Sequence, residues 1–186
     1  LQAIWARILA EECEAPGTVP LQLLHILSIL PKHLAEAFQR LCRFAFVFES
    51  ETHLLIQTSN MEFYNKYGLT FSDIQNLSAI GLITQSDALS PYALFLAMVL
   101  PYKKQYLINI GKAQFVCEIK NETDTRPQLA IGEVLLTQAG QALCAITKSN
   151  PPDEFPEFCA KYWRNKNVLV TRLDEAQEAA AVAAND

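Results

Sequence analysis

The segments LSAIGLI (residues 77–83) and LTQAGQAL (residues 136–143) carry the strongest structural signal in this chain. The first segment has the pattern of a helix that is closed by Gly81 and continues directly into a strand. The second has the pattern of a strand that runs into a helix, with Thr137 at the N-cap. The pairing of these two segments predicts a structural core with α+β architecture and no catalytic motif in it.

The pattern around these segments predicts further elements between residues 59 and 173. Ser72 is expected to cap the helix that ends at Gly81. Gly111 and Lys112 separate two strand-like runs, which predicts an antiparallel hairpin with a two-residue turn. Residues 129–136 read as one further strand. The remaining predicted elements are helices at 137–146 and 155–163 and a strand at 168–173.

The N-terminal part of the chain predicts three helices followed by a possible hairpin. The second helix, residues 21–30, is apolar except for a narrow polar seam, so we expect it at the centre of a core. The third begins after Pro31, with Glu36 and Arg40 spaced as an i,i+4 ion pair. Its expected buried line is Leu34, Phe38, Leu41 and Ala45. The hairpin would span residues 44–57, with its turn at residues 49–51.

These patterns predict an N-terminal helical unit (residues 1–58), an α+β unit (59–173) and a frayed Ala-rich tail (174–186). The N-terminal helical unit is expected to pack on the α+β unit. Because residue 1 is not Met and lies within a helical pattern, we also expect the natural chain to extend further. The longest apolar run, residues 93–100, is too short for a membrane helix, which needs about 20 residues.

Composition favours a protein that binds another protein. Apolar residues make up 51% and charged residues 19% of the 186 positions. Fifteen Lys and Arg oppose twenty Asp and Glu, giving a formal charge of −5. A chain with this balance lacks the basic face that is typical of nucleic-acid binding, so a nucleic-acid partner is possible but not favoured. Some of the apolar excess is expected to be covered by a protein partner or by self-association.

Neither the cysteines nor the histidines form a ligand pattern. The five cysteines share no CxxC spacing and no signal peptide precedes them, so we expect buried, reduced thiols in a cytoplasmic protein. His25 is expected in the core, and His33 and His53 on the surface. No metal or cofactor site is predicted. The chain also lacks a GxSxG motif, a phosphate-binding glycine loop and an HExxH motif, so we expect no catalytic residues and no enzyme activity.

Residues 72–83, the following hairpin and residues 135–143 resemble the recognition helix, wing and post-wing helix of bacterial winged-helix proteins. The intervening segment is much longer than an ordinary wing, so it must contain extra structure. A recognition helix is expected to present Arg, Lys, Asn or Gln to base edges. The exposed positions here include Gln75, Asn76 and Ser78 and no cation. Lys103, Lys104 and Lys112 would provide few phosphate contacts.

A second resemblance covers most of the chain. It rests on Trp-Ala-Arg-Ile-Leu-Ala-Glu-Glu (residues 5–12), Pro-Gly-Thr (16–18), Gly-Leu-Ile (81–83) and the later Leu-Thr-x-x-Gly motif (136–140). These motifs are similar to those of uncharacterised bacterial proteins classed as domains of unknown function. Relatives usually carry Ser-x-Arg after the Pro-Gly turn, whereas this chain has Pro-Leu-Gln at residues 20–22, so it lacks a cationic contact there. The resemblance implies no particular chemistry.

Taken together, these observations predict a cytoplasmic bacterial protein that acts as a non-enzymatic protein-interaction module. The candidate surface is the helix over residues 72–80 together with the hairpin around Lys112. The alternative is a DNA-binding transcriptional regulator of winged-helix type, in which lysines contact phosphates. The candidate contact residues for either function are Gln75, Asn76, Ser78, Lys103, Lys104 and Lys112.

Overall fold

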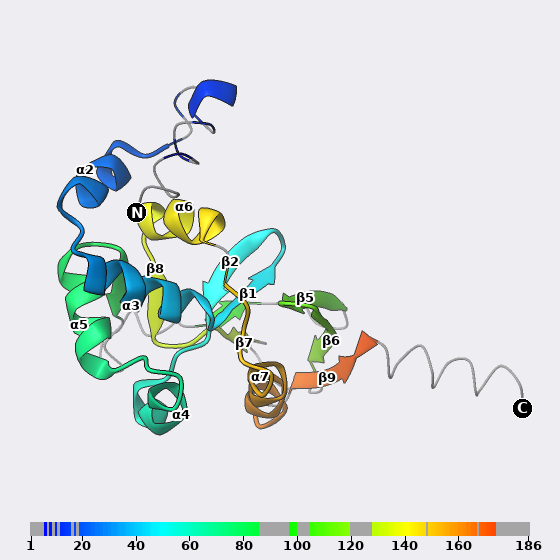
Figure 1. Cartoon of the computed structure of the whole chain (residues 1–186). Coiled ribbons are helices and arrows are strands. Elements are labelled where there is room, and N and C mark those ends of the chain that lie inside the picture. The colour runs from blue at the N-terminus through cyan, green and yellow to red at the C-terminus, as the bar shows by residue number, and fades with distance from the viewer. Residues whose placement is uncertain are drawn as a thin grey trace, which may run out of the picture.

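The computed structural model describes residues 19–85, 97–99, 105–119, 128–147, 149–166 and 168–173, together with residues 6, 8, 10, 12–15 and 17. Its elements are α2 (Leu21–Ile29), α3 (Lys32–Cys42), β1 (Ala45–Phe48), β2 (Glu51–Leu54), the 3-10 helix η1 (Thr58–Asn60), α4 (Met61–Asn65), α5 (Phe71–Ala79), β3 (Ile83–Gln85), β4 (Ala97–Val99), β5 (Tyr106–Ile110), β6 (Ala113–Ile119), β7 (Gln128–Ala130), β8 (Val134–Leu136), α6 (Gln138–Ile146), α7 (Phe155–Arg164) and β9 (Val168–Arg172). The predicted α+β class is confirmed (Figure 1).

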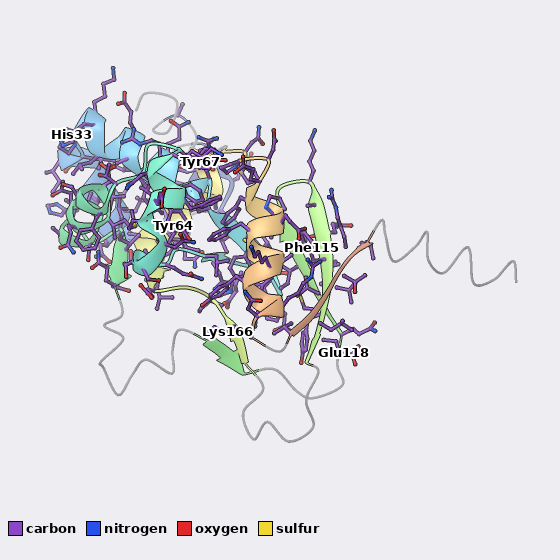
Figure 2. The ribbon with its side chains drawn as sticks, turned by 90° about the horizontal axis from the view of Figure 1, so that it is seen from below. His33, Tyr64, Tyr67, Phe115, Glu118 and Lys166 are labelled. Carbon is purple, nitrogen blue, oxygen red and sulfur yellow. The ribbon has the colours of Figure 1, made fainter. Side chains whose placement is uncertain are left out.

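Five strands form the main sheet in the order β2-β1-β5-β6-β9, and all neighbours are antiparallel. One face of the sheet is buried, because alternate residues of β1, β5, β6 and β9 lie in the core, and α7 packs on that face. On that face the Trp163 ring of α7 meets Phe46 of β1 edge-on, with 5.3 Å between ring centroids. In Figure 2, Phe115 lies between β6 and α7, and Glu118 lies on the other side of the strand.

The two segments that carry the sequence signal come together as predicted. β3 pairs with β8 in antiparallel register, with Ile83 opposite Leu136. α5 ends in a Schellman motif, in which the Leu82 N–H donates to the Leu77 carbonyl, and Gly81 has a φ of +81°. The Thr137 hydroxyl caps α6 by accepting from the Gly140 N–H at 3.1 Å. These contacts dock the start of α6 on the corner between α5 and β3.

Of two further strand predictions, one is confirmed and one is wrong. The hairpin of β5 and β6 around Gly111 and Lys112 is confirmed, with Ile110 opposite Ala113. The single strand at 129–136 is wrong, since it divides into β7 and β8 at Gly132, whose φ is +92°. Only glycine fits at this bend, because a Cβ on Gly132 would lie 2.7 Å from the Ile56 backbone nitrogen.

The N-cap of α5 is Thr70, not Ser72 as the sequence predicted. The Thr70 hydroxyl accepts from the Asp73 N–H, and the Asp73 carboxylate accepts from the Thr70 N–H, which completes a capping box. A capping box needs an acidic or amide residue three positions after the cap, and Asp73 provides it for Thr70. Ser72 lies inside the helix on its exposed side.

The N-terminal helices differ from prediction in two ways. α2 buries only one face, and Leu21 and Ile29 are 83% and 58% exposed, so the expectation that this helix lies at the centre of a core is wrong. Glu36 pairs with Lys32 at 3.7 Å and not with Arg40, because Arg40 turns toward Asp73. The buried line of α3 is otherwise as predicted, except that its last member, Ala45, is the first residue of β1. Most of the predicted first helix lies outside the described residues.

The predicted hairpin over residues 44–57 is confirmed as β1 and β2, with Glu49 and Ser50 at positive φ in the turn. β1 also pairs with β5, so the main sheet contains strands from both sides of residue 58. The division into units at that residue stays a prediction. The predicted tail, residues 174–186, lies outside the part of the chain that the structure describes.

Tyr64 joins α4 to the segment after β2 with two hydrogen bonds. Its hydroxyl is buried, donates to the Leu55 carbonyl at 2.9 Å and accepts from the Gln57 N–H at 3.2 Å. We expect Tyr64→Phe to lower the free energy of unfolding by about 2 kcal/mol, because it leaves two backbone groups without a partner. Urea unfolding measures this change. Tyr67→Phe, in the turn after α4, removes a half-buried residue's hydroxyl that bonds only to the exposed Lys66–Glu154 pair among the described contacts, and should cost less than about 0.5 kcal/mol. Equal losses in both variants would contradict the expectation.

Candidate interaction surfaces

The predicted contact residues of α5 are placed on its outer side. Gln75 and Asn76 are exposed and Ser78 is half-buried. The Gln75 amide donates to the Gln85 side chain at 3.2 Å, and the Asn76 amide donates to the Ser72 hydroxyl at 3.5 Å. This surface is polar and its amides bond to neighbours along α5 and β3.

Lys112 lies elsewhere. It occupies the turn between β5 and β6, and Figure 1 shows that hairpin at the opposite end of the molecule from α5. Lys112 and Arg172 line a hollow of about 340 Å³ beside Pro151 and Asp153. Lys103 and Lys104 lie outside the described residues. The structure therefore does not bring Lys112 together with the α5 residues.

The outer face of the main sheet exposes apolar side chains on neighbouring strands. Val47 of β1, Leu107 of β5 and Leu169 of β9 are 36%, 46% and 44% exposed. Leu107 lies directly opposite the half-buried Val116 of β6. Among the described side chains of these strands that point outward, Glu118 is the only charged one, and it accepts from Gln105 at 3.4 Å. We call Val47, Leu107, Val116 and Leu169 the sheet patch.

A second hollow, of about 470 Å³, lies between α3 and the loop that joins α6 to α7. Its lining residues are Glu36, Gln39, Arg40, Arg43, Ser149 and Asn150. The sequence analysis did not predict this hollow. The only signal was two arginines three residues apart, which share a helix face; the loop opposite them is distant in sequence, since Arg43 bonds to a residue 107 positions away.

An aromatic cluster lies beside Arg43, and Tyr67 connects the two through its contacts with Arg43 and Phe44. Phe44 is in edge contact with Tyr64 and Phe155, with ring centroids at 4.9 and 5.3 Å, and Phe63 stacks on Phe158 at 4.1 Å. These contacts join α4 to α7. Figure 2 shows Tyr64 and Tyr67 on neighbouring turns of this region.

One exposed ion pair lies at the edge of the cluster. The Lys66 ammonium group donates to both Glu154 oxygens, at 2.7 and 2.8 Å. This hydrogen bond lowers the pKa of the Glu154 carboxyl and raises the pKa of Lys66. Because both groups are exposed, the pair fixes geometry between α4 and α7 and adds little stability.

The cysteines and histidines show three departures from prediction, at Cys13, His25 and His53. Cys42, Cys117, Cys144 and Cys159 are buried free thiols as expected, whereas Cys13 is exposed. Burial raises the pKa of Cys117 to about 12, so this thiol stays protonated. His25 is exposed, because α2 presents that side to solvent, and the half-buried histidine is His53. His53 packs against Phe46 on the inner face, where burial lowers its pKa although Glu51 opposes the shift.

Within the described residues, no three His, Cys, Asp or Glu side chains gather as a metal site would require. None of the helices in the same part of the chain is long and apolar enough to cross a membrane.

Comparison with known proteins places the chain in a family without a described activity. Neither curated proteins nor solved structures give a significant match. A family model does match, over residues 1–159, which is most of the chain. The chain therefore belongs to the family described as "Protein of unknown function (DUF2806)".

Proposed function

We propose that this protein is a non-enzymatic protein-interaction module of the cytoplasm, and that its sheet patch pairs with a second copy of the same chain. The observation that carries the proposal is the exposure of Val47, Leu107 and Leu169 on one face of a continuous sheet. Exposed apolar side chains that gather on one face and are bordered by polar residues, here Asn109 opposite Val47 and Glu118 opposite Leu169, are typical of a surface that binds a partner.

The composition of the patch supports an identical partner. Pairing two copies about a two-fold axis brings the same surface against itself, so a net charge on the surface would repel its copy. The outward side chains described on β1, β5, β6 and β9 include one carboxylate, Glu118, and are otherwise neutral. Interfaces between identical subunits are also more apolar than transient ones. Such an interface should depend little on salt.

We expect a dimer in light scattering at about 100 µM protein, unchanged between about 0.1 and about 1 M salt. Leu107→Glu should give a monomer, because it places a charge in the centre of the patch. Its stability should change by less than about 1 kcal/mol, since Leu107 is half-exposed. A monomeric parent protein at this concentration contradicts the proposal.

Leu21→Glu is the matched control, because Leu21 is a leucine of α2 with 83% exposure and lies outside the sheet. This variant should remain dimeric. If Leu21→Glu dissociates the dimer and Leu107→Glu does not, the interface is on α2 and the sheet patch is not the docking surface.

The alternative function, a DNA-binding regulator of winged-helix type, is supported by the connection of α5 to β3 and by Lys112 beside Arg172. In light scattering it predicts a mass that depends on added DNA and on salt, whereas the interaction module predicts a mass that does not change with salt. The mass should rise when a duplex is added and fall back as salt increases, because phosphate contacts release counterions. That result would replace the interaction module as the function of this chain.

A further inference from the structure

The hollow beside α3 contains a guanidinium group without a hydrogen-bond partner in the described structure. Arg40 is about one-third exposed, and its Nε atom is buried with no partner. Its nearest carboxylate oxygen, Oδ2 of Asp73, is 3.7 Å from Nη2, which is beyond hydrogen-bond distance. That oxygen already accepts from the Thr70 N–H and hydroxyl, both at 2.9 Å.

The position of Arg40 is fixed even though its donors are not used. A Cβ added to Gly68 would lie only 3.3 Å from the Cδ atom of Arg40, so the turn before α5 packs closely on the aliphatic part of the arginine. Asp73 attracts the guanidinium from one side without a hydrogen bond. The Arg40 side chain is therefore held in place where it lines the hollow, and no hydrogen bond within the described residues uses its guanidinium group.

Arg43 presents a second guanidinium from the same helix face. Its Nε donates to the Asn150 carbonyl at 3.2 Å, and its Cζ lies 5.6 Å from the centre of the Tyr67 ring. These two contacts fix the stem and the plane of the group. The contacts found in the described residues leave both terminal nitrogens of Arg43 without a hydrogen bond, so they can donate to a ligand.

The remaining lining of the hollow suits an anion. Gln39, Ser149 and Asn150 add neutral polar side chains with hydrogen-bond donors. The one carboxylate at the rim, Glu36, is half-exposed and is paired with Lys32 at 3.7 Å. The volume of about 470 Å³ is within the range of small-molecule sites.

We infer that this hollow binds the phosphate group of a small molecule, with Arg40 and Arg43 as its two cationic contacts. A phosphate dianion carries up to two negative charges and three oxygens that accept from guanidinium forks, which matches two arginines and a ring of neutral donors. The site is separate from the sheet patch and does not depend on self-association.

A purely structural role makes a different prediction. Cations near the C-terminal end of a helix stabilise its negative end, and Arg40 and Arg43 are placed there on α3. Under that reading, replacing either arginine lowers stability and no ligand binds. Binding therefore has to be measured directly and compared with unfolding data for the same variants.

Inorganic phosphate is the first probe, added to about 20 mM while amide signals of the protein are followed by NMR. We expect saturable shifts at Ser149 and Asn150. Arg43→Gln should weaken phosphate binding about tenfold, through loss of charge-assisted hydrogen bonds. Arg43→Lys should retain part of the affinity because it keeps the charge without the fork.

Lys161→Gln is the control, because it removes one positive charge at an exposed side chain of α7 that does not line the hollow. It should bind phosphate as the parent does. The inference is overturned if phosphate gives no saturable shifts, if Lys161→Gln loses as much affinity as Arg43→Gln, or if a DNA duplex at equal phosphate concentration shifts the same signals far more strongly. The last outcome identifies the hollow as part of a nucleic-acid surface.

Discussion

Replacing Gly140 with alanine is expected to lower the free energy of unfolding by about 3 kcal/mol or more. In an ordinary helix this change would be favourable by up to about 1 kcal/mol, because alanine is the better helix former. Here the added Cβ would lie 2.0 Å from the Leu82 carbonyl oxygen and 3.1 Å from its carbonyl carbon. Both are backbone atoms, so α6 itself would have to move away from the corner.

Thermal and urea unfolding measure this loss, which corresponds to roughly 10 °C in the unfolding midpoint. Ala145→Leu is a suitable control, since Ala145 is on the exposed side of the same helix. It should change the stability by less than about 0.5 kcal/mol. A Gly140→Ala variant as stable as the parent would mean that the close approach of α6 to Leu82 is not required.

Phe44→Ala is expected to cost about 3 to 5 kcal/mol. Phe44 is fully buried at the junction between α3 and β1. Its ring meets Tyr64 at 4.9 Å, Phe155 at 5.3 Å and Tyr67 at 6.1 Å, all edge-on. Truncation leaves a cavity at the point where α4 and α7 join the sheet, and those rings lose their contacts together.

Phe71→Ala makes the same chemical change at a ring of α5 that is 49% exposed, and it should cost less than about 1 kcal/mol. Urea unfolding of the two variants gives the comparison. If Phe44→Ala loses no more stability than Phe71→Ala, the aromatic cluster does not hold the helices on the sheet. Phe44→Leu, which keeps much of the volume, should fall between the two.

Elements with a local cause could be predicted from the sequence. The turn at Gly111 and Lys112 could be predicted because a two-residue loop needs a positive φ that glycine tolerates. The packing of the distant Pro151 ring against Gly111, 2.6 Å from where a Cβ would lie, could not. The cap at Thr137 is decided within one turn of helix. The division at Gly132 was missed because it depends on the backbone of Ile56, which is distant in sequence.

The candidate sites show the same limit. The sheet patch was not predicted, since the order of β1, β5, β6 and β9 cannot be read from any single strand. Its residues have an ordinary alternating pattern, and the pattern does not say which other strands share a face. The exposed side of α2 was misjudged because an apolar composition alone does not distinguish a buried helix from one that presents Leu21 to solvent.

The strand order of the main sheet also constrains how the chain folds. β1 lies between β2 and β5, and β6 lies between β5 and β9, so two of the four pairings join strands that are far apart in sequence. Such pairings must close long loops before they gain contacts, and this slows folding. During synthesis, the hairpin of β1 and β2 emerges well before β5 and must wait with an open hydrogen-bonding edge. In that interval the edge can pair with other chains, so newly made protein is most exposed to aggregation before residues 106–119 have joined the sheet.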